Sequence, residues 1–90
     1  MKLVWRARAR ADVTTIIAYI ERASPAGAAK IQAEIGHGIS FLLEWPELGR
    51  RGRLATRELI VAHGAYLVIY KVSGEKVIIQ RVVHASRKRR

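Results

Sequence analysis

The residues of this 90-residue sequence best suited to bind a phosphate or an acidic group are its arginines and lysines. The chain has 17 of them against 7 acidic residues, which gives a formal net charge of +10. Most fall into three clusters, at the start, the middle and the end: Lys2, Arg6, Arg8 and Arg10; Arg50, Arg51, Arg53 and Arg57; Arg81, Arg87, Lys88, Arg89 and Arg90. Such clustering indicates a polyanionic or acidic partner, although solubility alone would also account for a basic surface.

Motifs for most other site chemistries are missing from the sequence. It contains neither a GxxxxGK[ST] phosphate loop nor a GxGxxG motif. There is no cysteine, and the three histidines stand singly, away from acidic residues at metal-ligand spacing. No serine lies in a nucleophile motif, and the acidic residues form no local acid/base pair. We therefore expect neither a metal site nor a cofactor.

Two polar residues of the last predicted strand, Arg81 and His84, are candidates for a site. A period of two places Val77, Ile79, Arg81 and Val83 on one face of this strand, and Ile78, Gln80, Val82 and His84 on the other. Because a buried arginine without a partner is costly, Arg81 should reach the rim of the sheet or pair with an acid such as Glu58. A purely structural ion pair for Arg81, and no role at all for His84, are the competing interpretations.

The N-terminal half of the chain predicts a strand followed by two helices. Lys2-Leu3-Val4-Trp5 is short and β-compatible. A helix is expected over residues 7–23 and a second over 25–44, since apolar residues recur at intervals of three or four. These are Val13, Ile16, Ile17 and Ile20 in the first helix, and Ala28, Ile31, Ile35, Ile39 and Leu42 in the second. Ser24-Pro25 separates the helices as N-cap and first helical residue, and Trp45-Pro46 ends the second. The short link implies an antiparallel hairpin.

The C-terminal half predicts a small antiparallel sheet. Residues 47–55 form an arginine-rich loop, and strands are expected over 56–62, 65–72 and 75–84, separated by His63-Gly64 and Ser73-Gly74. The first strand can add to this three-stranded meander, and the helical hairpin can cover one of its faces. The prediction is a single α+β domain over residues 1–90, in the order β-α-α-β-β-β, with a basic tail at about 85–90. No stretch is long enough to cross a membrane and no signal peptide is recognisable, so a cytoplasmic location is expected.

Several short motifs, taken in their order and spacing, resemble the RelE/ParE toxins of bacterial toxin–antitoxin pairs. The likeness covers nearly the whole chain. It rests on Ile17-Ala18-Tyr19-Ile20, Ser24-Pro25, Pro46-Glu47-Leu48-Gly49-Arg50, Thr56-Arg57-Glu58-Leu59, Tyr66-Leu67-Val68-Ile69-Tyr70-Lys71-Val72, and Val77 to His84 with Arg87. The resemblance implies a toxin whose partner is an antitoxin that folds a disordered C-terminal segment over it. A cationic domain of this size suits such an acidic partner.

The resemblance leaves two mechanisms open. The RelE-like branch cuts mRNA in the ribosome with basic residues on the sheet and a C-terminal tyrosine or His-Tyr pair. Arg57 and Arg87 match basic positions of that branch, and His84 could serve as acid/base. However, the sequence departs from this branch at several positions: Leu59 and Leu67 stand where Lys or Arg is expected, no tyrosine follows Tyr70, and Ala85 follows His84. The ParE branch, which poisons DNA gyrase and is not recognised as an enzyme, looks closer through Arg81-Val82-Val83-His84 and Arg87.

The leading interpretation is therefore a ParE-like toxin that inhibits DNA gyrase and is neutralised by a cognate antitoxin. The residues expected to bind the target are Arg57, Arg81, His84 and Arg87. The alternatives are a ribosome-dependent mRNA endonuclease using Arg57, His84 and Arg87, and a non-toxic nucleic-acid-binding module. For the antitoxin we expect contacts on the exposed side of the hairpin and the sheet edge, anchored by Trp5, Tyr19 and Trp45. Packing within the chain is the competing role for these three aromatic residues.

Overall fold

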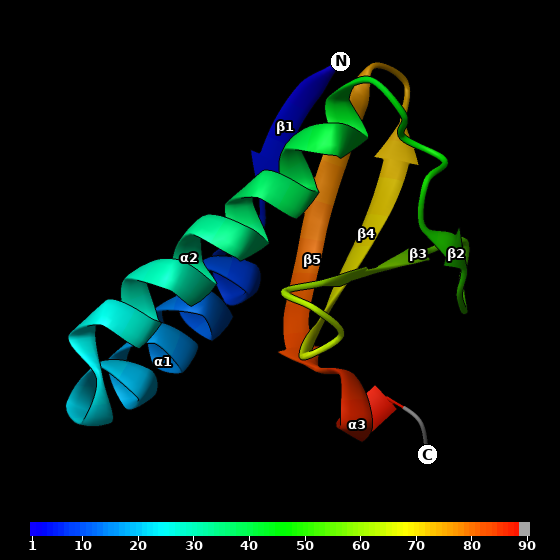
Figure 1. Cartoon of the computed structure of the whole chain (residues 1–90). Coiled ribbons are helices and arrows are strands. Elements are labelled where there is room, and N and C mark those ends of the chain that lie inside the picture. Colours follow the sequence, from blue (N-terminus) through cyan, green and yellow to red (C-terminus); the bar gives the residue numbers. More distant parts are fainter. Residues whose placement is uncertain (89–90) are drawn as a thin grey trace.

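The helical hairpin predicted from the sequence is present. In the computed structural model, which describes residues 1–88 and side chains as far as Ser86, α1 spans Ala7–Ala23 and α2 spans Pro25–Ser40 (Figure 1). The Ser24 side chain caps α2 by accepting a hydrogen bond from the Gly27 N–H at 2.9 Å, with Pro25 in the first turn. Both ends of α1 agree with the prediction.

The second helix is shorter than predicted. Instead of running to residue 44, α2 ends at Ser40 and tightens into a 3-10 turn, η1, over Phe41–Leu43. Such a turn satisfies terminal carbonyl groups that have no partner further along the helix, and the Trp45 N–H closes it by donating to the Phe41 carbonyl. The chain then leaves the helix toward Pro46. As a result, Phe41 and Trp45 sit at the point where the helix turns into a loop.

The sheet has five strands in the order β1-β5-β4-β3-β2. Its strands are β1 Lys2–Trp5, β2 Arg50–Arg51, β3 Arg57–Val61, β4 Tyr66–Ser73 and β5 Lys76–His84. The predicted antiparallel meander is confirmed as β3-β4-β5. Strand β1 joins it parallel to β5, so the sheet is mixed. Strand β2, which was not predicted, pairs with β3 through only two residues, because Gly52 already begins the turn back.

Strand β5 departs from a regular period of two. Ile69 pairs with Arg81 while Tyr70 pairs with Ile79, so Gln80 is an extra residue and forms a β-bulge. The buried residues of β5 are accordingly Val77, Ile79 and Val82. The prediction that Val82 lies on the face opposite Ile79 was therefore wrong, because the bulge shifts the alternation by one residue.

The core lies between the hairpin and one face of the sheet. Figure 1 shows α1 and α2 on the same side of the strands, with the short α3 (Ala85–Lys88) at the end of β5. Buried side chains from both layers make up this core, among them Ala9, Ile35, Ile39, Val68, Tyr70, Val77 and Ile79. Gly38 permits the close approach of α2 to β3, since a Cβ there would lie 2.5 Å from Val61 Cγ1. None of the helices described over residues 1–88 combines the length and apolarity needed to cross a membrane.

Candidate functional site

Arg57 holds the loop that precedes β2. Its Nη1 donates to the Gly49 carbonyl at 2.8 Å and to the Glu47 carbonyl at 3.3 Å. The Tyr70 hydroxyl, which is fully buried, completes this clamp: it donates to the Pro46 carbonyl at 2.7 Å and accepts from the Gly49 N–H at 2.8 Å. Burial raises the pKa of Tyr70, so its hydroxyl remains a donor at neutral pH. Arg57, which was predicted to bind the target, therefore forms hydrogen bonds within the chain that hold this loop.

Arg81 forms a bidentate ion pair with Asp12 of α1. Its Nε and Nη2 lie 2.8 Å and 3.2 Å from the two carboxylate oxygens, and the Val82 N–H donates to the same carboxylate at 2.9 Å. Burial alone would raise the pKa of Asp12, but hydrogen bonds from Arg81 and Val82, with the charges of Arg81 and Arg8, hold it below its ordinary value. The same contact raises the pKa of Arg81.

The acid that pairs with Arg81 is therefore Asp12, not Glu58. Glu58 is buried and accepts from Arg50 Nε at 3.3 Å. Asp12 was not expected from the sequence, because it lies 69 positions before Arg81. Its position one turn before Ile16, on the helix face that meets the sheet, is the signal that places it there. The ion pair joins α1 to β5 and so supports a structural role for Arg81.

His84 lies directly opposite Tyr66 at the end of the β4–β5 hairpin. The two ring centroids are 4.8 Å apart. Tyr66 is buried, which raises its pKa, whereas His84 is exposed. Both residues line a hollow between α1 and the end of the sheet, together with Asp12, Thr15, Ile16, Tyr19, Arg81, Val82 and Val83. We call this the His84 hollow. It brings two of the predicted target residues, Arg81 and His84, into one place.

Of the other two predicted target residues, Arg57 lies outside this hollow, and the side chain of Arg87 is not described by the structure. Arg57 pairs with Tyr70, four residues from Tyr66 along β4, which at ~3.3 Å per residue is roughly 13 Å from the His84 hollow. Arg87 belongs to α3, but its side chain lies outside the part of the chain that the structure describes, as do residues 89–90 of the predicted tail. The structure therefore does not bring the four target residues together.

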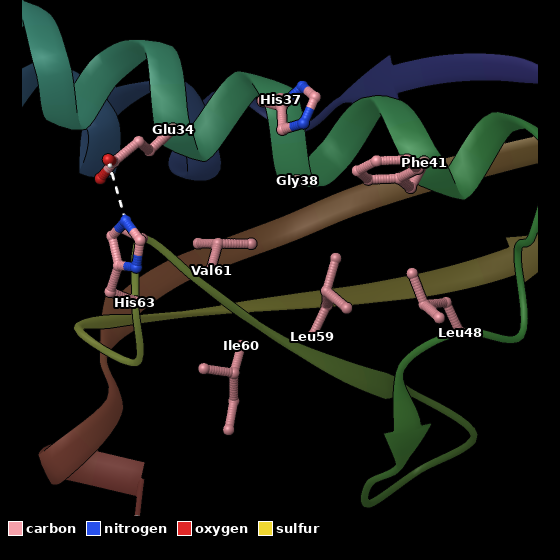
Figure 2. A pocket seen from close by; sticks show the side chains of 10 residues that line it. Glu34, His37, Gly38, Phe41, Leu48, Leu59, Ile60, Val61 and His63 are labelled. Carbon is pink, nitrogen blue, oxygen red and sulfur yellow. Dashed lines mark hydrogen bonds and ion pairs between the residues drawn. The ribbon is translucent and has the colours of Figure 1, made fainter.

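A second hollow, mostly apolar, lies between α2 and β3 (Figure 2). Its volume is about 290 Å³, and its lining consists of Glu34, His37, Gly38, Phe41, Leu48, Leu59, Ile60, Val61, Ala62 and His63. We call it the α2–β3 groove. An ion pair between His63 Nε2 and Glu34 Oε2, 3.2 Å long, bounds one end. At the other end Leu48 and Phe41 are both substantially exposed.

The three proposed aromatic anchors occupy three different places. Trp45 is 56% exposed, and its ring lies tilted beside that of Phe41, with 6.1 Å between the centroids. It also sits beside Leu48, so it flanks the α2–β3 groove. Tyr19 is 74% exposed and lines the His84 hollow. Trp5 is half-buried and packs against the core, which agrees with the alternative of packing within the chain. They do not form a single surface.

Comparisons with known proteins agree on one family. A family model described as "ParE toxin of type II toxin-antitoxin system, parDE" matches residues 3–89. The protein Y4kP of Sinorhizobium fredii is 40% identical over 85 residues, covering 93% of this chain and 88% of its own. Toxin RelE2 of Caulobacter vibrioides is 37% identical over 86 residues, with coverages of 96% and 97%.

A solved structure has the same fold. A chain titled "Chromosomal ParDE TA system from P. aeruginosa" superimposes with a TM-score of 0.82, covering 93% of this chain and 95% of its own. The two sequences are 23% identical. This likeness confirms the predicted fold class.

Proposed function

The chain belongs to the ParE toxin family of type II toxin–antitoxin systems, and we propose that it arrests growth by inhibiting DNA gyrase until a cognate antitoxin covers it. The observation that carries the proposal is the family match over residues 3–89. The net charge of +10 also supports it, because a gyrase–DNA complex and an acidic antitoxin segment are both suited to a cationic partner.

We propose that the target-binding surface is centred on the His84 hollow. His84 is exposed, while Arg81 is held by Asp12 and acts by keeping this end of the molecule in shape. Arg57 is held by the Gly49 carbonyl and acts by keeping the loop before β2 in place. The backbone of α3 follows His84 directly, so Arg87 belongs to the same end of the chain. An exposed histidine on a buried tyrosine, beside the exposed ring of Tyr19, offers an aromatic, weakly polar contact of the kind that anchors protein interfaces.

One observation favours the enzymatic alternative, an mRNA endonuclease. No tyrosine follows Tyr70 in the sequence, so the C-terminal His-Tyr pair of the RelE-like branch is missing there. In the fold, however, His84 contacts the ring of Tyr66, and a histidine and a tyrosine do meet. Two other observations weigh against it. The charge of Arg81 is balanced by Asp12, and Leu67, at a position where a cation was expected, is fully buried. A scissile phosphate needs cations aimed at it, so we rank gyrase inhibition first.

The test is a DNA supercoiling assay with purified gyrase and the full chain, in which trapped DNA cleavage is also measured. We expect inhibition by this chain, and reversal when the antitoxin encoded beside it is added. A chain that arrests growth but leaves gyrase untouched would overturn the proposal. Mapping of mRNA 5′ ends after induction then decides for the alternative, which predicts codon-phased cuts within translated messages.

A further inference from the structure

One edge of the sheet is only half covered. Strand β2 pairs only with Arg57 and Glu58 of β3. In the part of the chain described, the next three residues of β3, which are Leu59, Ile60 and Val61, have no neighbouring strand on that side. The Gly52 N–H donates to the Thr56 carbonyl, and hydrogen-bonded pairs recur at every second residue of an antiparallel ladder. The N–H and C=O of Ile60 therefore point toward the open edge, while Leu59 and Val61 direct theirs to β4.

The α2–β3 groove lies along this open edge. Figure 2 shows Leu59 and Val61 pointing up toward α2, and Ile60 pointing away from it. Residues opposite one another on paired strands place their side chains on the same face. A strand added beside β3 would thus hydrogen-bond to Ile60 and insert two side chains, two residues apart, beneath α2. An added strand would therefore find hydrogen-bonding groups on the Ile60 backbone and an apolar groove for its side chains next to each other.

The opposite edge of the sheet offers no such combination. Strand β1 exposes the backbone of Leu3, because Lys2 and Arg6 direct their N–H groups to β5. The hollow at that edge, however, is lined by Met1, Lys2 and the turn Ser73–Lys76, rather than by apolar groups of a helix. An added strand there would gain hydrogen bonds but little apolar burial.

We infer that the α2–β3 groove and the Ile60 edge bind an extended segment of the antitoxin as an added β-strand, with apolar residues at two alternate positions and acidic residues at the end near β2. This inference rests on the proposed antitoxin partner. The charge requirement follows from Arg50 and Arg51, which are exposed where β2 pairs with the same edge of β3. A second copy of this chain would also carry +10, so it would be repelled from the same edge.

The first test measures hydrogen exchange by NMR in the free chain and in its complex with the full-length antitoxin encoded beside it. In the complex, the Ile60 amide should exchange about 100-fold more slowly than in the free chain, and the Leu3 amide should be unchanged. A complex that protects Leu3, or leaves Ile60 unprotected, overturns the inference while the toxin function stands. Absence of any complex overturns the proposed antitoxin partnership. If the chain associates with itself and the Ile60 amide is already protected without antitoxin, the edge binds a second copy of the chain and the inference is wrong.

Matched variants test the same inference through affinity. Ile60→Pro removes the outward N–H without removing a bond to β4, and Ile60→Thr keeps that N–H. We expect antitoxin affinity to fall at least ~30-fold for the proline variant and only a few-fold for threonine. Phe41→Ser should weaken binding about 10- to 100-fold, whereas Leu43→Ser, equally exposed but outside the groove, should change it less than about 3-fold. The inference is wrong if the proline and threonine variants lose equal affinity and the two serine variants also lose equal affinity. If Ile60→Pro does not fold, the comparison of Phe41→Ser with Leu43→Ser is the test.

Discussion

Tyr66 and His84 occupy opposite positions on β4 and β5, so that an exposed imidazole rests on a buried phenol ring, 4.8 Å between centroids. Both residues line a hollow that residues of α1 also line. This arrangement makes His84 the most accessible of the proposed target residues whose side chains are described.

Replacing His84 tests whether this hollow contacts the target. His84→Ala should raise the concentration of the chain needed for half-maximal gyrase inhibition by about 10-fold, because an interface contact is lost. The free energy of unfolding should change by less than about 0.5 kcal/mol, since the residue is exposed. His37→Ala changes another exposed histidine, one that lines the α2–β3 groove; it is the control and should inhibit like the parent. If both variants keep full potency, the target surface lies elsewhere.

Breaking the ion pair between Asp12 and Arg81 should destabilise the fold. Asp12→Ala leaves the Arg81 guanidinium and the Val82 N–H without their acceptor, and we expect a loss of about 2 kcal/mol, discounted for partial exposure. Urea denaturation at pH 7 measures it. Arg8→Ala serves as the control, because Arg8 acts on Asp12 only through its charge. A loss equal to that of Arg8→Ala would mean that the pair contributes little.

The same ion pair predicts a pH dependence of stability. The pKa of Asp12 is lowered in the folded chain, so its contribution is fully present above the ordinary value of 3.8 and is lost as the pH falls through the lowered value. We expect the difference in stability between the parent and Asp12→Asn to shrink as the pH drops below about 4. Denaturation curves collected from pH 7 down to the acid limit give this difference. A difference that stays constant across that range contradicts the assignment.

Two glycines of α2 should respond in opposite ways to alanine. Gly36 faces open space, so Gly36→Ala should stabilise the chain by up to about 1 kcal/mol through helix propensity. Gly38→Ala would place its Cβ against Val61 Cγ1, and the stiff valine resists moving, so a net loss of about 1 kcal/mol is expected. Thermal denaturation of the two variants side by side gives the answer. Stabilisation by both would mean that α2 and β3 are less closely packed than described.

Removing one hydroxyl should loosen the loop before β2. Tyr70→Phe deletes the donor to the Pro46 carbonyl and the acceptor of the Gly49 N–H, both of which are shielded, so we expect a loss of about 1–3 kcal/mol. Tyr19→Phe, whose hydroxyl belongs to an exposed ring, is the matched control and should be neutral. Equal stability of the two variants, measured by urea denaturation, would show that the clamp does not hold the loop.

The local elements of this protein could be predicted from its sequence. Helix α1 follows from apolar residues at intervals of three and four, and its end from Ser24-Pro25, because these signals act within one turn of the chain. The meander follows from alternating β-branched residues and the two glycine turns. The exception is the end of α2, where the apolar pattern continues through Leu42 although the backbone has already tightened into η1.

What depended on register and on distant partners was decided only by the tertiary structure. Counting back from the Ser73–Lys76 turn would place Val83 opposite Tyr66, and only the bulge at Gln80 brings His84 there. The Asp12–Arg81 ion pair and the half-covered edge at Ile60 likewise depend on how elements far apart in sequence pack together. The chain's residue pattern determines which segments fold and which faces are apolar. Which residues meet is determined by packing, because one inserted residue in a strand shifts every contact beyond it.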